Sequence, residues 1–500
     1  MKKNTKKLLF FILMTCVIIQ YVSATDTQVK ASDFNGKKIA IQSGTTFVTL
    51  VDDIFEDADV LYYEFLPDCI AAVKQGKADA VLGDEPAVRY CISQVEGVSY
   101  ILHGETADYM ASIAPKTEEG EKYISQFNEY YRKIVENGER DKLLSKWLDG
   151  SPVEQTIEDY SKFPATNGTL IIATDPSFPP LQFVRNDMIV GYEIELWVNF
   201  CKEYGYKPQI ESVSFGGIIA GVISGKYNIG ASGFSITDER KQKVLFSDVI
   251  VKSGTAIAFA SGKSKVDFTT GFNSTFLQDN RWKSFLSGIF VTTRITVFSI
   301  LLGIVLGFGL YLLVRGGNKY VIVISEVFKR LIVGMPVVVW LMVLYYIFFG
   351  KSGISGEAVA VIGFSILFAF SISSMLAMGE RSVDSGQAIA ADAMGYSKRK
   401  TFFRIILPQA IQMMLPSFQD ESISHLKATA IVGYIAVVDV TKVGDLIRGM
   451  TYDAFFPLIA VALAYFILSG ILRLIIFAVR KKTDPHLRSN EAVLKGAVLK

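Results

Sequence analysis

The chain has 500 residues, enough for two or three domains, and half of them are hydrophobic. Its formal net charge is only +2, which gives no sign of a nucleic-acid partner. Three scattered histidines argue against a zinc site, and we expect no metal and no cofactor. Because the four cysteines lack metal-like spacing, we expect free or buried thiols, and a Cys69–Cys91 bridge is the less favoured alternative.

Residues 1–24 have the pattern of an export signal. Four lysines precede an apolar stretch at 8–22, and Val22-Ser23-Ala24 supplies small residues for cleavage. An uncleaved anchor stays open as an alternative, because nothing in the sequence proves that the signal is cut. We expect the residues that follow to be exported.

Two blocks of alternating short strands and helices follow the signal, at 30–150 and 168–265. This alternation predicts a sheet built from βα units, so both blocks belong to the α/β class. Each block has roughly 100 residues, which is small for a complete domain of this kind. A polar linker at 151–167, which carries Pro152 and Pro164, separates the blocks.

The two blocks resemble different parts of one polar-amino-acid binding protein. The later block carries ATDPSFPP at 173–180 and SITDER at 235–240, which look like the opening of that family. The earlier block carries GKKIAIQSGTT at 36–46 and ADAVLGDEP at 78–86, which look like the part that usually comes later. Placing 168–265 before 30–150 restores the family's usual order.

The resemblance implies a circularly permuted two-lobe domain of the type II periplasmic-binding-protein fold. Residues 168–265 would form the main part of lobe 1, and residues 30–150 would form lobe 2 plus the C-terminal helices of lobe 1. Permutation is physically reasonable where natural termini lie close together. Two separate half-domains remain the alternative, although neither half would then contain a ligand cleft.

An amino-acid ligand offers a carboxylate and an ammonium, and a closed cleft has to pair both charges. Arg240 is the natural clamp for the carboxylate, because its planar fork binds two oxygens at once. Ser232, Gly233 and Ser235 would add donors from the turn before it. A plain helix cap at 235–239 is the alternative, and both can hold together because a helix N-terminus favours anions.

Further ligand contacts are expected from the other lobe and from aromatic walls. Thr45 and Thr46 follow a glycine at a strand-to-helix turn, where helix capping is the alternative role. In the family, the acid that matches Asp84 takes the ammonium, and a structural cap is again the alternative. Asp175 would reach a cationic or amide side chain, and the expected walls are Phe178 and Phe215.

Apolar stretches dominate residues 285–481, and about 20 apolar residues suffice to span the hydrocarbon core. We expect an all-α transmembrane domain of about five helices, with a linker at 266–284 and a tail at 482–500. Basic residues cluster at the ends that would lie inside, so we expect a cytoplasmic C-terminus and an extracytoplasmic binding domain in the cell membrane. The expected spans lie near 286–314, 321–349, 357–379, 428–446 and 453–479.

A charged segment interrupts this apolar half: QAIAADAMG at 387–395, then a basic cluster, then ILPQA at 406–410. It resembles the coupling loop of polar-amino-acid ABC permeases, which docks on a separate ATPase. The resemblance points to Ala390, Ala391, Gly395, Leu407 and Pro408 as the coupling residues. The family usually has Glu where this chain has Ile389, so the contact would be altered. A cytoplasmic amphipathic loop with no special role is the alternative.

Taken together, these features predict a fused substrate-binding and permease subunit of an ABC importer for polar amino acids. Gly262-Lys263-Ser264 is no phosphate loop, because Ile257 stands where that motif needs Gly, so an ATPase must act in trans. Five spans would make half a pore, and we expect a dimer of this chain rather than a heterodimer. The rivals are an amino-acid-gated ion channel and a membrane chemoreceptor, and no arrangement typical of a hydrolase is present.

Overall fold

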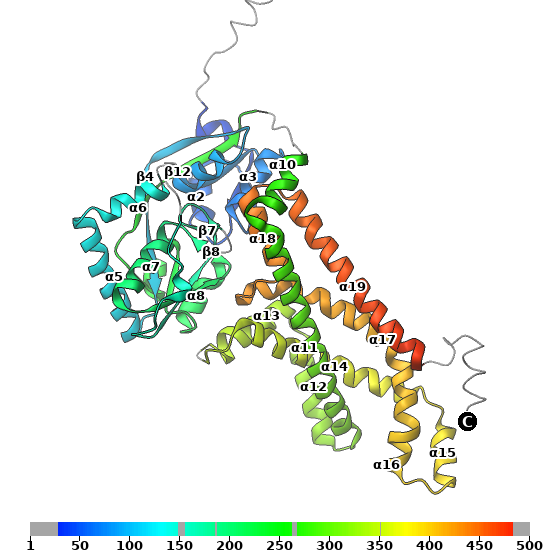
Figure 1. Ribbon diagram of the computed structural model, residues 1–500. Coiled ribbons are helices and arrows are strands. Elements are labelled where there is room, and N and C mark those ends of the chain that lie inside the picture. Colours follow the sequence, from blue (N-terminus) through cyan, green and yellow to red (C-terminus); the bar gives the residue numbers. More distant parts are fainter. Residues whose placement is uncertain (1–28, 149–155, 186–187, 263–267, 351, 484–500) are drawn as a thin grey trace, which may run out of the picture.

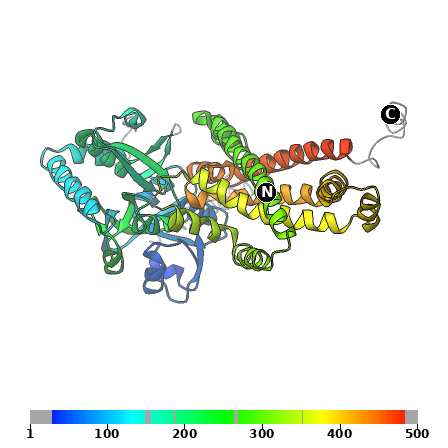
Figure 2. The same ribbon diagram turned by 90° about the horizontal axis from the view of Figure 1, so that it is seen from below.

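The computed structural model describes residues 29–148, 156–185, 188–262, 268–350 and 352–483. The expected export signal, the start of the expected 151–167 linker and nearly all of the expected tail lie outside these residues. The described chain has an α/β unit and an elongated helical half (Figure 1). Seen from below, the two halves lie end to end (Figure 2).

Lobe 1 is built around three parallel strands, β5 (Thr169–Thr174), β9 (Lys207–Ser212) and β10 (Ile229–Ser235). The short strand β11 (Leu245–Phe246) and the far part of β4 (Val98–Ala114) complete the sheet in antiparallel register. The helices of this lobe include α7 (Tyr192–Tyr204), α8 (Phe215–Ile223) and α9 (Asp238–Lys243). A small antiparallel sheet lies beside them, formed by β6 (Ser177–Phe178), β7 (Gln182–Arg185) and β8 (Met188–Val190).

Lobe 2 repeats the same plan with strands from the other block. Its strand order is β2-β1-β3-β12-β4, with β1 (Lys38–Gln42), β2 (Asp59–Tyr63), β3 (Ala80–Asp84) and β12 (Val251–Ala260). Every residue of β3 is buried, which explains its unbroken apolar run, because parallel strands covered on both faces need no polar alternation. Its helices are α2 (Phe47–Ile54), α3 (Leu66–Lys74) and α4 (Glu85–Ser93).

Two long strands join the lobes and make them one domain. Strand β12 pairs with β4 first at Val251–Ser253 in lobe 1 and then, after a register shift, from Thr255 onward in lobe 2. The chain then returns after β4 to lobe 1 as α5 (Glu118–Glu136) and α6 (Glu139–Trp147), which pack in one core with Leu170 and Trp197. The two blocks therefore form a single permuted two-lobe domain, and the alternative of two separate half-domains is wrong.

Within the described residues, three helices of the other half are long and apolar enough to cross a membrane: α11 (Arg281–Arg315), α14 (Gly356–Arg381) and α19 (Phe455–Thr483). Glycines let α11 and α14 approach closely. A Cβ at Gly303 would lie 2.8 Å from the Phe368 Cβ, and one at Gly307 would lie 2.6 Å from the Ala369 carbonyl oxygen. Small residues at such contacts are typical of helix pairs in membranes.

The expected second span, 321–349, is bent rather than straight. Helix α12 (Lys319–Val333) is bent by 105° relative to the pair α13 (Val337–Met342) and η5 (Val343–Phe348). Taken together, these helices are long and apolar enough to span a membrane. The break falls at Gly334–Pro336, where proline has no N–H to continue the helix. Counting this pair, the described residues contain up to four candidate spans, which is roughly consistent with the expected five.

The placement of a span at 428–446 is wrong. That region holds a short 3₁₀ helix (η7, Thr429–Ile435), a connection, and the amphipathic helix α18 (Val440–Thr451). The preceding α17 (Leu407–Ala428) has 22 residues, so it is about 33 Å long and packs against α14 and α19. The expected linker at 266–284 is helical in its described part, where α10 (Phe268–Phe272) precedes two short helices.

Candidate functional site

A small cavity lies between the lobes, where strand ends from both lobes meet. All ten predicted ligand residues line it, together with Gln42. Its volume is about 20 Å³, enough for a water molecule but not for an amino acid, so the structure has a closed cleft. The lining residues are Gln42, Thr45, Thr46 and Asp84 from lobe 2, and Asp175, Phe178, Phe215, Ser232, Gly233, Ser235 and Arg240 from lobe 1.

Arg240 projects from α9 across the cleft and connects the two lobes. Its Nη1 donates to the Ser235 carbonyl at 3.0 Å, and its Nη2 donates to the Gly44 carbonyl of lobe 2 at 3.1 Å. Burial lowers the pKa of Arg240, and the negative charge of Asp108 opposes that shift. The alternative of a plain cap is also realised, because the Thr237 hydroxyl accepts from the Arg240 amide at 3.2 Å. The cap is therefore made by Thr237, and the Arg240 guanidinium faces the cavity.

The three predicted donors before Arg240 have different partners. The Ser232 hydroxyl oxygen accepts from the Asp175 amide and from the Gln182 side chain, so its own proton is available to a ligand. The Gly233 amide donates to the Glu193 carboxylate at 2.7 Å and is thereby already used. The Ser235 hydroxyl donates to Asp108. Of the three groups, Ser232 is thus the best placed to donate.

Asp84 is a buried acid at the end of β3. It is 7% exposed, and its Oδ1 accepts from the Ser253 hydroxyl at 3.2 Å. Burial, and then the nearby charge of Asp108, raises the pKa of Asp84 to about 8. Although Asp84 precedes α4, its side chain makes no capping hydrogen bond, so the structural-cap alternative is not what the geometry shows. A carboxyl in such a place favours a cationic neighbour.

Asp175 is held inside lobe 1 and does not extend freely into the cavity. Its Oδ1 accepts from the Ser177 hydroxyl at 2.7 Å, and its Oδ2 accepts from the Phe215 amide at 3.0 Å. Burial raises the pKa of Asp175, and the positive charge of Lys442 in α18 opposes the shift most strongly. Asp175 therefore fixes the turn before α8 as well as lining the cavity.

The remaining predicted residues shape the walls. The Thr45 hydroxyl donates to the Gln42 carbonyl at 2.7 Å, and Thr46 precedes α2 without a capping side-chain bond. Phe215 stacks on Phe234 with ring centroids 4.9 Å apart. The sequence interpretation missed Gln42, which is 5% exposed and donates to the Glu64 carbonyl at 3.1 Å. Gln42 is the last residue of β1, just before the predicted turn, and this position could have indicated that it lines the cleft.

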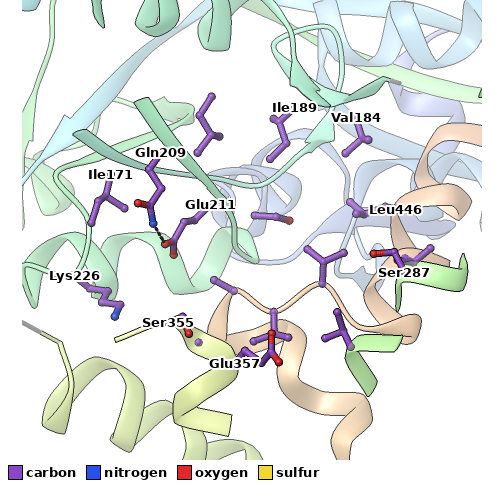
Figure 3. Close-up of a pocket in the computed structure, with 18 of the residues that line it drawn as sticks. Ile171, Val184, Ile189, Gln209, Glu211, Lys226, Ser287, Ser355, Glu357 and Leu446 are labelled. Atoms are coloured by element: carbon purple, nitrogen blue, oxygen red, sulfur yellow. Dashed lines mark hydrogen bonds between the residues drawn. The ribbon is translucent and has the colours of Figure 1, made fainter. Parts of the chain in front are cut away.

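A second and much larger cavity lies between lobe 1 and the helical half (Figure 3). It has a volume of about 900 Å³ and is lined by β9, by the start of α14 and by α18. Two of its charged side chains are hydrogen-bonded within the protein. Glu211 accepts from Gln209 at 2.8 Å and from the Tyr345 hydroxyl at 3.1 Å, and Lys226 donates to the Ile354 carbonyl at 2.8 Å.

The helices α15 (Ser385–Ala393) and α16 (Lys398–Thr401) of the predicted coupling segment lie at the end of the helical half farthest from the α/β unit (Figure 1). Ala390 and Ala391 belong to α15, which is followed by α16. Ala391 is buried and Ala390 is exposed, while Gly395 has φ +77°, a conformation that favours glycine. Leu407 and Pro408 open α17, where proline is well tolerated. Ile389 is 70% exposed.

The described cysteines are free thiols. Cys69, Cys91 and Cys201 are all buried and unbridged, which confirms the expectation of free thiols over a Cys69–Cys91 bridge. Burial raises the pKa of Cys91 to about 12, so this thiol is unreactive at neutral pH.

Comparison with known proteins finds one solute-binding family and several permease relatives. Residues 170–493 match the bacterial extracellular solute-binding proteins, family 3, and the match begins at β5. The chain is 32% identical over 211 residues to the arginine transport system permease protein ArtQ of Bacillus subtilis, covering 41% of this chain and 93% of that protein. It is 29% identical over 199 residues to a glutamine transport system permease protein GlnP of Rickettsia bellii, covering 39% and 91%. It is also similar to the crystal structure of an amino acid ABC transporter with histidines, at 27% identity and a TM-score of 0.39, covering 44% of this chain and 100% of that one.

The chain therefore belongs to family 3 of the bacterial extracellular solute-binding proteins. In this chain the binding domain is permuted and fused to the permease half of an ABC importer. It is a membrane protein and a transport component rather than an enzyme.

Proposed function

We propose that the chain binds a polar amino acid outside the cell membrane and passes it through a pore lined by its permease half. The observation that carries the proposal is that a guanidinium and a carboxyl group from opposite lobes, Arg240 on lobe 1 and Asp84 on lobe 2, line one closed cleft. The curated relatives include permease proteins of glutamine, arginine and L-cystine transport systems. All three of those substrates are polar amino acids.

In this proposal Arg240 holds the ligand carboxylate, and the Ser232 hydroxyl adds a donor. Asp84 holds the ammonium. The ligand then supplies the positive charge that a buried carboxylate needs beside it. Phe178 and Phe215 form the walls, while Thr45 and Thr46 add contacts from lobe 2. Because the closed cavity is only about 20 Å³, the lobes have to open about the β4 and β12 crossings before a ligand enters.

On the cytoplasmic side we propose that a separate ATPase docks on the segment 385–408. Helix α15 and the turn after it expose two apolar side chains, Ile389 at 70% and Met394 at 65%, and such exposed apolar groups suit a protein partner. Two copies of this chain would form the pore, with an extracytoplasmic binding domain and a cytoplasmic C-terminus. The start of the chain would act as the export signal.

The test is ligand-dependent stabilisation of the purified full-length chain. Its unfolding temperature is measured in detergent with each of the twenty amino acids. We expect a polar amino acid to raise that temperature progressively with concentration, because a ligand that binds only the folded state stabilises it. An Arg240→Met variant should lose this response. If no amino acid stabilises the full chain, the proposed substrate class is wrong.

Co-purification that never recovers an ATPase from the native membrane would favour the ion-channel alternative.

A further inference from the structure

We propose that the chain binds one phospholipid on the side of the membrane that faces the binding domain. The phosphate lies beside Arg294, the acyl chains lie in a groove between α11 and α14, and the headgroup extends into the large cavity beside lobe 1. This inference goes beyond the proposed function, because it does not depend on which molecule the cleft between the lobes takes.

Two ion pairs between α11 and α14 mark the two ends of the hydrocarbon core. Arg294 pairs with Glu357 near the start of α14, and Arg315 pairs with Glu380 at its end. The 20 residues 295–314 between the two arginines carry no charge, and a helix of that length rises about 30 Å, which is the thickness of the hydrocarbon core. Because Glu357 also lines the large cavity, its ion pair marks the boundary on the side of the binding domain (Figure 3).

An apolar groove begins next to the Arg294–Glu357 pair and runs toward the middle of the membrane. Its volume is about 570 Å³, and Phe298 and Val305 in its wall are more than half exposed. Val305 lies about 16 Å deeper along α11 than Arg294. The lining residues are Phe298, Leu301, Leu302 and Val305 of α11, and Ala358, Val361 and Ile362 of α14. A groove lined only by apolar side chains at this depth suits an acyl chain.

The groove and the large cavity are joined through Arg294 along one face of α11. Successive residues of this face are three or four positions apart, which keeps them on one side of a helix. They are Ser287 and Val291 from the cavity, then Arg294, and then Phe298, Leu302 and Val305 from the groove. On α14, Glu357 lines the cavity and the next residue, Ala358, lines the groove. A molecule with a polar head and an apolar tail can therefore occupy both spaces at once.

Arg294 is suited to a phosphate group. Its Nη2 donates to Glu357, but a guanidinium has five N–H donors, and the side chain is still 40% exposed. The guanidinium carbon lies 5.3 Å from the centroid of the Phe290 ring. Aromatic rings are enriched at this level of a membrane protein, and the planar fork of arginine binds phosphate through two parallel hydrogen bonds. In the cavity, Lys226 adds a second positive charge and Ser287 adds a hydroxyl for the headgroup (Figure 3).

The first experiment measures phospholipid binding to the full-length chain by native mass spectrometry. The chain is freed of lipid in detergent and titrated with phosphatidylglycerol, with phosphatidylethanolamine, and with a diacylglycerol that has the same acyl chains but no phosphate. We expect one phospholipid per chain, bound about tenfold or more tightly than the diacylglycerol, because only the phospholipid makes charged hydrogen bonds. Equal binding of the diacylglycerol would overturn the proposal. Displacement of the phospholipid by inorganic phosphate would also overturn it, since the site would then take the free anion.

Two matched double variants test the role of Arg294. Arg294→Gln with Glu357→Gln removes both charges and leaves two amides that can bond to each other. Arg315→Gln with Glu380→Gln makes the same change at the other end of the same two helices, where the side chains are almost equally exposed. We expect the first variant to weaken phospholipid binding about tenfold and the second to leave it within about twofold. Equal affinities of the two variants would refute the site.

Photolabelling of the unsubstituted chain decides the question even if a variant fails to fold. A phospholipid with a diazirine in one acyl chain is added at one molecule per chain, and the labelled residues are located by peptide mass spectrometry. We expect most of the label on residues 298–305 and 358–362. Helix α19 is the control, because Phe466 and Leu474 are at least as exposed as Val305.

Equal labelling of α19 would mean that the groove has only the ordinary contact of a membrane protein with bulk lipid. Label on α19 alone would mean that a second copy of the chain covers the groove. Either result would contradict the proposal.

Discussion

Two cavities in the described part of the chain differ in a way that volume alone would misrepresent. The cleft between the lobes has about 20 Å³ of space, whereas the cavity between lobe 1 and the permease half has about 900 Å³. The smaller one brings an arginine and two buried acids together from opposite lobes. The larger one is lined by groups that already pair within the protein, such as Glu211 and Lys226. Here the ionisable groups that converge from both lobes, rather than the amount of empty space, mark the smaller cavity as the candidate binding site for the amino acid.

The largest expected effect is the loss of ligand binding in Arg240→Ala. Removing a charged hydrogen-bonding group from a closed site costs about 1.5–3 kcal/mol, or roughly 10- to 150-fold in affinity. Binding of the stabilising amino acid to the full-length chain is measured by calorimetry. Gln209→Ala in the larger cavity is the matched control and should change the affinity less than twofold. If Gln209→Ala weakens binding as much as Arg240→Ala, the assignment of the two cavities is wrong.

Asp84→Asn should weaken binding nearly as much and also remove its pH dependence. In the ligand-free protein the pKa of Asp84 is about 8, so at neutral pH this carboxyl carries a proton that an ammonium would have to displace. The affinity of the parent chain should therefore rise by up to tenfold per unit as pH increases to about 8, and then level off. Affinities measured from pH 6 to 9 test this. A parent curve as flat as that of Asp84→Asn would contradict the role of Asp84.

Asp84 should also make the stability of the folded chain depend on pH, in the direction opposite to that usual for a carboxyl group. Its folded pKa of about 8 lies above the ordinary value near 4, so between these pH values the folded chain holds a proton that the unfolded chain lacks. The contribution of Asp84 to stability therefore falls as pH rises from about 4 to about 8. The unfolding temperature of Asp84→Asn, relative to the parent, should rise over this range. A difference that stays constant with pH would show that Asp84 is ionised in the ligand-free protein.

Gly395→Glu should separate binding from transport. Gly395 has φ +77° in the segment far from the cleft, and a side chain there is strained by about 1 kcal/mol or more. We expect unchanged ligand affinity and loss of uptake in cells that contain the native ATPase. Ile389→Glu, which restores the residue usual in the family, should keep uptake. If Gly395→Glu loses ligand binding as well as uptake, the coupling segment and the ligand cleft are not independent.

The permuted fold was predicted because the two blocks resemble different parts of one binding-protein family. The ten residues that line the cleft were found from that resemblance together with local motifs at the ends of strands. The sequence did not predict which of those groups were already used, since the bond from the Gly233 amide to Glu193 joins residues 40 positions apart. In the permease half, hydropathy identified the long helices but misplaced a span at 428–446. Helix α18 is apolar on one face only, and Val440, Val443 and Ile447 on that face pack with Phe285 of α11 and Ala464 of α19. These contacts lie far apart in sequence, so no window of local hydropathy can contain them.

The smallest expected effect concerns the join between the two blocks. A protease site introduced between residues 150 and 155 and cut in the folded protein should leave ligand affinity within about twofold of the uncut chain. Helix α6 stays attached to lobe 1 without the linker, because Trp147 Nε1 donates to Glu195 at 2.6 Å and Lys146 pairs with the same carboxylate at 2.8 Å. Trp147 is also 1% exposed in the core of lobe 1.

Binding before and after the cut is compared by calorimetry, with an uncut chain carrying the same site as the control. A large loss of affinity on cutting would mean that the linker itself is needed to hold the two blocks together. Little change would mean that packing against lobe 1 is sufficient, which is the condition under which a permuted order of the same two blocks can give the same cleft.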